Sequence, residues 1–103
     1  MDQFLDLFLN YLTVERGLAA NTLEAYGRDL RDYIGFLNRQ SVTAPEAVDS
    51  GLVVQFLGEC RKNGLAARSR ARRLAAIRSF HKFLHTEGYA EQNPAAQVSL
   101  PKN

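Results

Sequence analysis

Apolar residues recur along this chain at steps of three and four positions, the spacing that places side chains on one face of an α-helix. Four segments show this spacing, and none shows the sustained alternation of a strand. The first two segments carry Phe4, Leu5, Phe8, Leu9, Tyr11 and Leu12, then Leu23, Tyr26, Leu30, Tyr33, Ile34 and Leu37. The last two carry Val53, Phe56, Leu57 and Cys60, then Leu74, Ile77, Phe80, Phe83 and Leu84. The pattern predicts an all-α fold of four helices.

Glycines and capping residues predict where these helices begin and end. Gly17, Gly64 and Gly88 follow three of the apolar stripes, and glycine tolerates the left-handed backbone that closes many helices. Asp49 precedes the third stripe and is the expected N-cap of that helix. The fourth helix, from about residue 67 to 87, has no capping side chain before it and is expected to start between residues 65 and 69.

The second helix has a stronger start signal. Asn21 followed by Glu24 forms a variant capping box, in which the Asn side chain accepts from first-turn amides and Glu24 reaches back. We therefore expect this helix to open at Asn21. Residues 39–48, which include Ser41, Thr43 and Pro45, are expected to form the loop that follows it.

Length and composition limit the protein to a small domain. A chain of 103 residues supports a single core, and its lone cysteine, Cys60, cannot form an intrachain disulfide. Cys60 lies on an apolar stripe, so we interpret it as a core residue. No apolar run reaches the roughly 18 residues of a membrane span, and the N-terminus lacks the basic start of a signal peptide. We expect a cytoplasmic protein without membrane contact.

The net charge of +2 conceals a strong polarity along the chain. Residues 1–60 carry four basic against nine acidic residues, a net charge of −5, whereas residues 61–103 carry nine against two, a net charge of +7. Between residues 61 and 82 there are eight basic residues and no acidic one. A local field of this kind attracts polyanions.

The basic residues of the fourth helix separate into two groups on a helical wheel. Those opposite the apolar stripe, with the small residues between them, are Arg68, Arg72, Ala75, Ser79 and Lys82, and Arg78 lies near the edge of this set. Arginines can bind phosphates or guanine edges, and the small residues let the helix approach a DNA duplex closely. Arg70 and Arg73 fall nearer the apolar side and are weaker candidates.

The second helix offers a smaller surface at its start. Asn21 and Thr22 can contact phosphate through side chains and free amides, although capping alone would also explain Asn21. Arg28 lies two turns further along a related face. The acidic residues of this helix, Glu24, Asp29 and Asp32, argue against its whole length lying on a polyanion.

No catalytic or metal-binding constellation emerges. His81 and His85 are one turn apart, but no cysteine or carboxylate completes a metal set, so we interpret the pair as structural. The four tyrosines lie on or beside apolar stripes and are expected to pack. We predict no cofactor, no metal and no small-molecule substrate.

The order and spacing of several short runs resemble the N-terminal core-binding domain of tyrosine recombinases of the phage integrase family, most closely the bacterial Xer type. These runs cover essentially the whole chain. They are Glu15-Arg16-Gly17-Leu18, Asn21-Thr22-Leu23, Ala25-Tyr26, Asp29-Leu30, Arg72 with Leu74, Ala76, Arg78, Phe80, Phe83 and Leu84, then Glu87-Gly88, Asn93-Pro94-Ala95 and Pro101-Lys102.

The resemblance implies a four-helix, SAM-like integrase N-terminal bundle whose second and fourth helices approach the major groove of a recombination half-site. The positions it points to are Asn21, Thr22, Ala25 and Arg28, and Arg68, Ser69, Arg72, Ser79 and Lys82. Residues 1–90 would form this DNA-binding domain, and residues 91–103 would begin the linker to a C-terminal catalytic domain. Partner recombinase subunits in a synaptic tetramer are implied as well.

Two features of the chain limit what the resemblance implies. The family often carries Ser or Thr where this chain has Ala66 and Ala67, and an apolar residue where Arg73 stands, so the chain departs from the family's pattern in residues that bear on the first-turn contacts of the fourth helix. The family's catalytic residues lie in the C-terminal domain, so this chain should not cleave DNA. An alternative interpretation is a helical protein-interaction module whose acidic first half meets a basic partner.

Overall fold

The computed structural model describes residues 1–100, in which four α-helices and one short 3₁₀-helix form and no strand is present. The helices are α1 (Asp2–Val14), α2 (Ala20–Arg39), α3 (Ser50–Lys62) and α4 (Ala67–Thr86), and the 3₁₀-helix η1 (Pro45–Ala47) lies in the expected loop. The prediction of an all-α, four-helix fold is confirmed. Within residues 1–100, no helix is both long and apolar enough to cross a membrane. The last three residues of the expected linker, 101–103, lie outside the described part.

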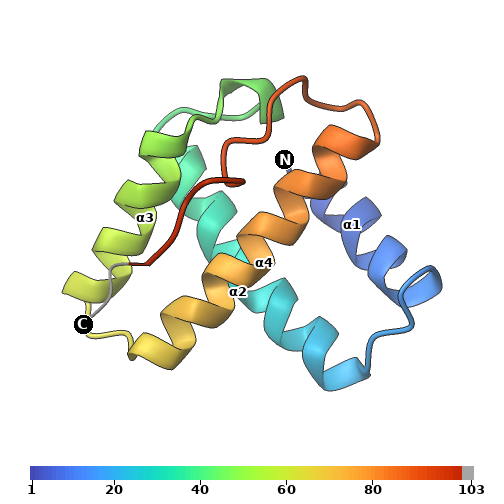
Figure 1. Ribbon diagram of the computed structural model, residues 1–103, viewed down its shortest axis with the longest axis horizontal. Coiled ribbons are helices and arrows are strands. Elements are labelled where there is room, and N and C mark those ends of the chain that lie inside the picture. Colours follow the sequence, from blue (N-terminus) through green and yellow to red (C-terminus); the bar gives the residue numbers. More distant parts are fainter. Residues whose placement is uncertain (101–103) are drawn as a thin grey trace.

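The two longest helices, α2 and α4, cross at the centre of the molecule (Figure 1). α1 packs against both of them on one side, and α3 packs against both on the other. Figure 1 shows that α2 and α4 both begin on the lower side of the view, at opposite corners, with the start of α4 beside the end of α3 and the start of α2 beside the end of α1. Their N-terminal turns, which hold several of the predicted DNA-binding residues, are therefore separated along the long axis of the molecule.

Three helix ends follow the sequence pattern. Gly17, Gly64 and Gly88 adopt φ angles of +60°, +85° and +80°, the left-handed region that reverses the chain after a helix. The Asp49 side chain accepts a hydrogen bond of 2.9 Å from the Leu52 amide and caps α3. The start of α4 at Ala67, without a side-chain cap, also agrees with the prediction.

The predicted capping box at the start of α2 is wrong. The helix begins one residue earlier, at Ala20, and its N-cap is Ala19, whose carbonyl accepts from the Leu23 amide. Asn21 therefore lies inside the first turn, where its own backbone is already helical and its side chain caps nothing. Glu24 pairs with Arg28 instead, at 3.7 Å.

Aromatic rings fill the core between the helices. Phe8 on α1 lies 5.5 Å from Phe80 on α4, and Tyr33 on α2 lies 5.3 Å from Phe56 on α3, measured between ring centroids. Cys60 is buried beside them, as predicted for a core residue. Tyr89 was expected to pack as well. Although it is exposed, its ring centroid lies 5.1 Å from that of Phe4.

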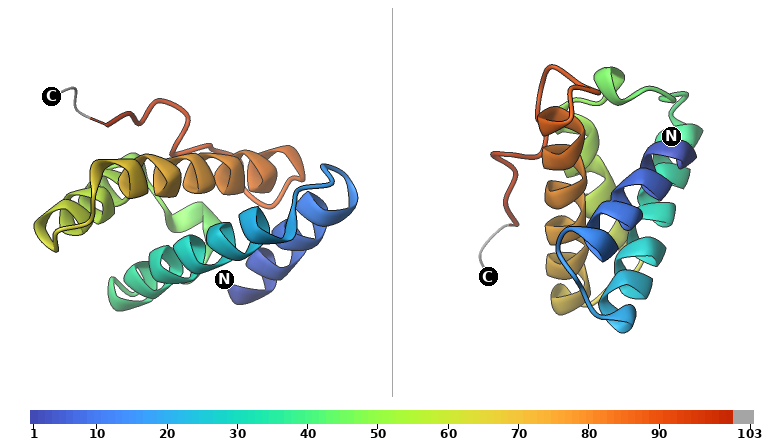
Figure 2. Two further views of the ribbon diagram at one scale, coloured as in Figure 1. Left: turned by 90° about the horizontal axis from the view of Figure 1, so that it is seen from below. Right: turned by 90° about the vertical axis from the view of Figure 1, so that its right-hand side faces the viewer.

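The segment that follows α4 turns back over the bundle. Ala90, Ala95 and Val98 are buried, and the Arg78 guanidinium donates a hydrogen bond to the Val98 carbonyl. Figure 2 shows this segment on the side of α4 that faces away from α1 and α2. The described part of the expected linker is thus packed onto the helical domain.

Candidate nucleic-acid interface

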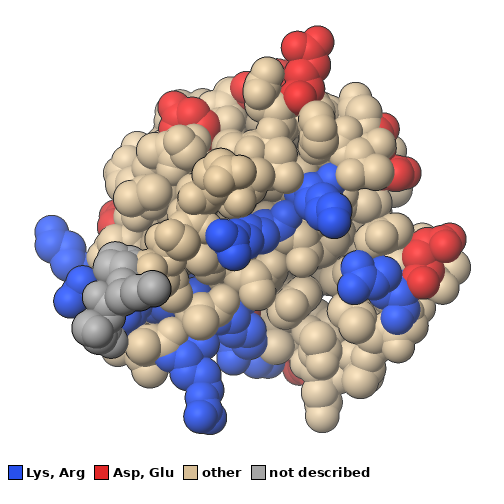
Figure 3. Space-filling view, in the orientation of Figure 1, with Lys and Arg blue, Asp and Glu red and all other residues tan. Residues whose placement is uncertain are grey.

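The predicted basic stripe is present on the outer surface of α4. Arg68, Arg72 and Lys82 are exposed with Ala75 between them, and Ser69 and Ser79 are half-buried at the margins. Arg78 is also exposed, although its guanidinium is engaged by the Val98 carbonyl. Figure 3 shows Lys and Arg side chains across the face along which α4 runs, with Asp and Glu at its periphery. Cationic side chains spread over one face in this way can contact a phosphate backbone at several points.

The start of α2 exposes the polar residues expected there. Asn21, Thr22 and Arg28 are exposed, and Ala25 is half-buried. Because Ala19 provides no side-chain cap, the first amides of α2 point outward without an intrahelical partner. Such amides, with the positive end of the helix dipole, favour an anion. Capping was the alternative explanation for Asn21 in the sequence. Because the helix starts at Ala20, Asn21 has no capping role.

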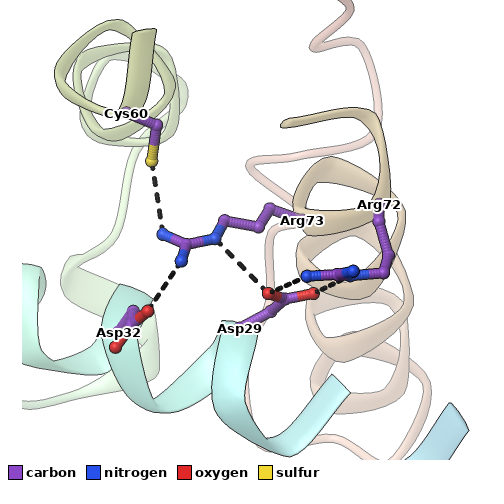
Figure 4. Close-up of polar contacts among 5 residues, drawn as sticks. All are labelled: Asp29, Asp32, Cys60, Arg72 and Arg73. Carbon is purple, nitrogen blue, oxygen red and sulfur yellow. Dashed lines mark hydrogen bonds and ion pairs between the residues drawn. The ribbon is translucent and has the colours of Figure 1, made fainter. Parts of the chain in front are cut away.

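Two adjacent arginines of α4 occupy different environments (Figure 4). Arg72 has a side chain that is 44% exposed, whereas that of Arg73 is only 17% exposed. Both reach Asp29 on α2, a carboxylate that is almost fully buried. From the sequence, Asp29 was one of the acidic residues expected to keep the rest of α2 off a polyanion. The structure corrects this for Asp29, because it is buried and paired with two guanidinium groups.

The pair between Asp29 and Arg72 is bidentate. Arg72 Nε donates to Asp29 Oδ2 at 2.8 Å, and Arg72 Nη2 donates to Asp29 Oδ1 at 3.0 Å. The hydrogen bond to Asp29, with the charge of the same carboxylate, raises the pKa of Arg72 above its ordinary value. The guanidinium is consequently held charged and in a defined orientation.

Arg73 holds α2, α3 and α4 together. Its Nη2 donates to Asp32 at 2.7 Å, its Nε lies 3.3 Å from Asp29 Oδ1, and its Nη1 contacts the Cys60 sulfur at 3.5 Å. The guanidinium also lies 5.8 Å from the centre of the Phe56 ring. These contacts agree with the prediction that Arg73 faces the apolar side. The second arginine predicted there, Arg70, donates to the Leu65 carbonyl.

Arg16 is a candidate that the helical wheel of α4 did not include. It follows α1 and, together with Ser79 and Lys82, lines a groove of about 360 Å³ between α1 and α4. Arg16, which is far from α4 in the sequence, thus lies beside the predicted surface of that helix. No spacing pattern relates residues so far apart in the chain, so only the tertiary structure reveals this neighbour.

The two histidines have no metal-binding arrangement. His81 is buried, and its Nε2 lies 2.7 Å from the Tyr33 hydroxyl. Burial lowers the pKa of His81 to about 4 and raises the pKa of Tyr33, with the charge of Asp49 adding to the latter. His85 is exposed, with Nδ1 3.3 Å from the Ala90 carbonyl. Over the described residues, no group of three potential ligands comes together.

Comparison with known proteins identifies the family. A family model described as the phage integrase, N-terminal SAM-like domain matches residues 5–88. Among curated proteins, the tyrosine recombinase XerD of Chlorobaculum tepidum is 46% identical over 98 residues, which cover 95% of this chain and 32% of that protein. The tyrosine recombinase XerD of Staphylococcus saprophyticus is 38% identical over 102 residues, covering 99% of this chain and 35% of that protein.

The chain thus spans about a third of the length of these relatives. Its helical architecture and the match to residues 5–88 agree with each other and with the resemblance found in the sequence. The chain belongs to the phage integrase N-terminal SAM-like domain family.

Proposed function

We propose that this chain is the DNA-binding N-terminal domain of a XerD-type tyrosine recombinase, a class of enzyme that carries out site-specific DNA recombination. The relatives named tyrosine recombinase XerD support the assignment of the parent protein. In this proposal, α2 and α4 contact one side of a recombination half-site, and the catalytic domain would contact the other.

The cationic stripe on α4 is the observation that carries the proposal. Arg68, Arg72 and Lys82 form one exposed row with little bulk between them, and a helix of this width fits the major groove. The start of α2, with Asn21 and Thr22 exposed, lies on the same lower side of the molecule as the start of α4 in Figure 1, at the opposite corner. In this proposal the two helix starts contact phosphates at separate points along the half-site.

The remaining parts of the proposal concern the whole protein. Residues 1–90 would bind DNA, and residues 91–103 would lead toward the catalytic domain, the first part of that linker lying against α4. Cleavage and strand exchange would depend on residues outside this chain, so the chain alone should bind without cutting. Partner subunits in a synaptic tetramer, a role in chromosome dimer resolution, a cytoplasmic location and the lack of any cofactor remain predictions.

Titration of a fluorescent duplex that carries the half-site of a XerD relative tests the DNA-binding role. We expect binding at low salt that weakens steeply as salt rises, because Lys and Arg displace counterions from the phosphates. Replacing Lys82 with Gln should lower affinity and reduce the slope of log affinity against log salt by about 1. Arg39→Gln removes a charge from the last turn of α2, at the far end from the proposed contact, and serves as the control.

Equal effects of Lys82→Gln and Arg39→Gln would show a diffuse charge effect and contradict the proposed surface. The absence of binding at low salt, with helical circular dichroism intact, would reject the DNA-binding role.

A protein-interaction role is the second candidate, because α1 exposes apolar side chains. Leu7 and Val14 on α1 and Tyr89 after α4 are exposed by 44%, 67% and 41%, and they line one shallow groove. Chemical-shift mapping separates the two roles. Changes along Arg68 and Lys82 on adding DNA support the first, whereas changes confined to Leu7 and Val14 on adding a partner protein support the second.

A further inference from the structure

Asp29 lies beneath the exposed Arg72. Asp29 is 1% exposed, and its two oxygens accept hydrogen bonds from Nε and Nη2 of Arg72 (Figure 4). A buried carboxylate requires a partner to offset its lost hydration, and Arg72 supplies one from α4. The pair joins two helices at residues 43 positions apart in sequence.

The bidentate pair leaves the outer edge of Arg72 available. A guanidinium carries five N–H donors. Asp29 uses one on Nε and one on Nη2, so two remain on Nη1 and one on Nη2. The donors at the far end of the group form a fork that can bind two acceptors side by side. Because the side chain is 44% exposed, this part of the molecule remains open to a ligand.

Asp29 is itself held in place by Arg73. Arg73 Nε lies 3.3 Å from Asp29 Oδ1, and Arg73 is in turn fixed by Asp32 at 2.7 Å and by the Cys60 sulfur at 3.5 Å. The carboxylate that orients Arg72 is therefore anchored in the packed interior. Figure 4 shows the resulting order, from Cys60 and Asp32 through Arg73 and Asp29 to Arg72.

The fork left on Arg72 matches one feature of DNA. In the major groove, guanine presents N7 and O6 as two neighbouring acceptors, and arginine binds them in a bidentate manner. A guanidinium already fixed in orientation loses less side-chain freedom on binding than a free one. The buried carboxylate also offsets much of its charge, which weakens its attraction to phosphates in general. Both effects favour base recognition over non-specific backbone contact.

We propose that Asp29 is a positioning residue that holds Arg72 in the orientation needed to recognise a guanine in the major groove. The inference rests on the proposed DNA-binding function and assigns a specificity role within it. In this arrangement Arg68 and Lys82 provide the phosphate contacts, and Arg72 provides the base contact.

A binding selection from DNA duplexes with randomised central positions tests the inference through sequence preference. The wild-type chain should enrich a guanine at one position, by about tenfold over the other bases for a contact of this type. Asp29→Asn should lose that preference while binding the pool at least as tightly, since a negative charge is removed. Asp32→Asn removes the same charge one turn away. Among the described side chains Asp32 pairs only with Arg73, so this variant should keep the preference.

Arg72→Lys provides a second test in which Asp29 is kept. It tests the inference even if circular dichroism shows that Asp29→Asn is unfolded. Lysine keeps the charge but cannot pair with Asp29 and present a fork at once. We expect Arg72→Lys to lose the guanine preference while retaining most of its affinity for the pool.

Three results would overturn the inference. One is a guanine preference retained in Asp29→Asn or in Arg72→Lys. Another is an equal loss of preference in Asp29→Asn and Asp32→Asn. The third is wild-type binding without any base preference, which would reject the inference alone. Failure of the wild type to bind any duplex at low salt would reject the DNA-binding function and the inference together.

Discussion

At the scale of single residues, Arg72 and Arg73 show how one position along a helix changes the role of a side chain. A step of about 100° places Arg72 at the edge of the exposed stripe and turns Arg73 toward α2 and α3. Arg73 joins three helices through Asp29, Asp32 and Cys60. Among the described side chains, Arg72 forms an ion pair only with Asp29, and it keeps an exposed edge. Arg73 therefore joins the helices, whereas Arg72 presents the edge that we propose for recognition.

Also at the residue scale, buried His81 should make stability depend on pH. The unfolded chain gains a proton on this ring near pH 6.5, but burial delays protonation of the folded chain until about pH 4. The unfolded state therefore binds more protons between these values, and stability falls as the pH is lowered. The total loss should be on the order of 3 kcal/mol by pH 4.

Urea unfolding of the wild type and of His81→Gln measures this effect at pH 7, which lies above the window between the two pKa values, and at pH 6 and 5, which lie within it. Gln keeps a polar group near the Tyr33 hydroxyl but does not titrate. We expect the slope of stability against pH to be smaller in the variant. Parallel curves for the two proteins would assign the pH dependence to other groups.

At the scale of secondary-structure elements, the helix starts differ in how they are capped. α3 has the Asp49 side chain on the Leu52 amide, whereas α2 and α4 start at Ala20 and Ala67 without side-chain caps. α1, which follows Met1, also lacks a side-chain cap, so the absence of a cap is shared by the two helices whose starts we propose to meet DNA but is not confined to them. Free amides at those starts stay available for phosphate, and water satisfies them otherwise.

Replacing Asp49 and Asn21 in turn by Ala compares the residue that caps α3 with the residue that the sequence predicted to cap α2. Asp49→Ala should lower the free energy of unfolding by about 1 kcal/mol, because the Leu52 amide loses its acceptor. Asn21→Ala should change it by less than about 0.5 kcal/mol, because Asn21 lies within the helix and Ala favours that conformation. Thermal unfolding followed by circular dichroism measures both. A larger loss of unfolding free energy for Asn21→Ala would indicate that Asn21 does cap the helix.

At the scale of the whole molecule, the charge polarity and the chain path act together. The segment after α4 returns over the helices and buries Ala95 and Val98. The same segment places the Val98 carbonyl on Arg78, beside the stripe proposed to bind DNA. The segment that we expect to begin the linker is thus part of the domain surface next to that stripe.

Val98→Ala tests whether the returning segment contributes to the stability of the domain. Val98 is 6% exposed, so its truncation should cost about 2 kcal/mol in urea unfolding. Gln97→Ala, at an exposed neighbouring position, should change the stability by less than about 0.5 kcal/mol. Similar small effects at both positions would indicate that the segment is not bound to the bundle in solution.

The sequence predicted most of the helices because their signals are local. Apolar residues three and four apart fixed the four buried faces, and glycines with positive φ marked where three helices end. The start of α2 was predicted at the wrong residue because Asn21 and Glu24 have the spacing of a capping box. Only the backbone, which turns helical already at Ala20, decides which residue is the cap.

The candidate site divides in the same way. The sequence by itself determined the row of Arg68, Arg72 and Lys82, because residues on one helix keep a set angular relation whatever packs against it. Only the tertiary structure decided that Asp29 is a buried partner of Arg72 and that Arg16 joins the same surface. These contacts join residues that are far apart in the chain, and their geometry depends on how the helices cross.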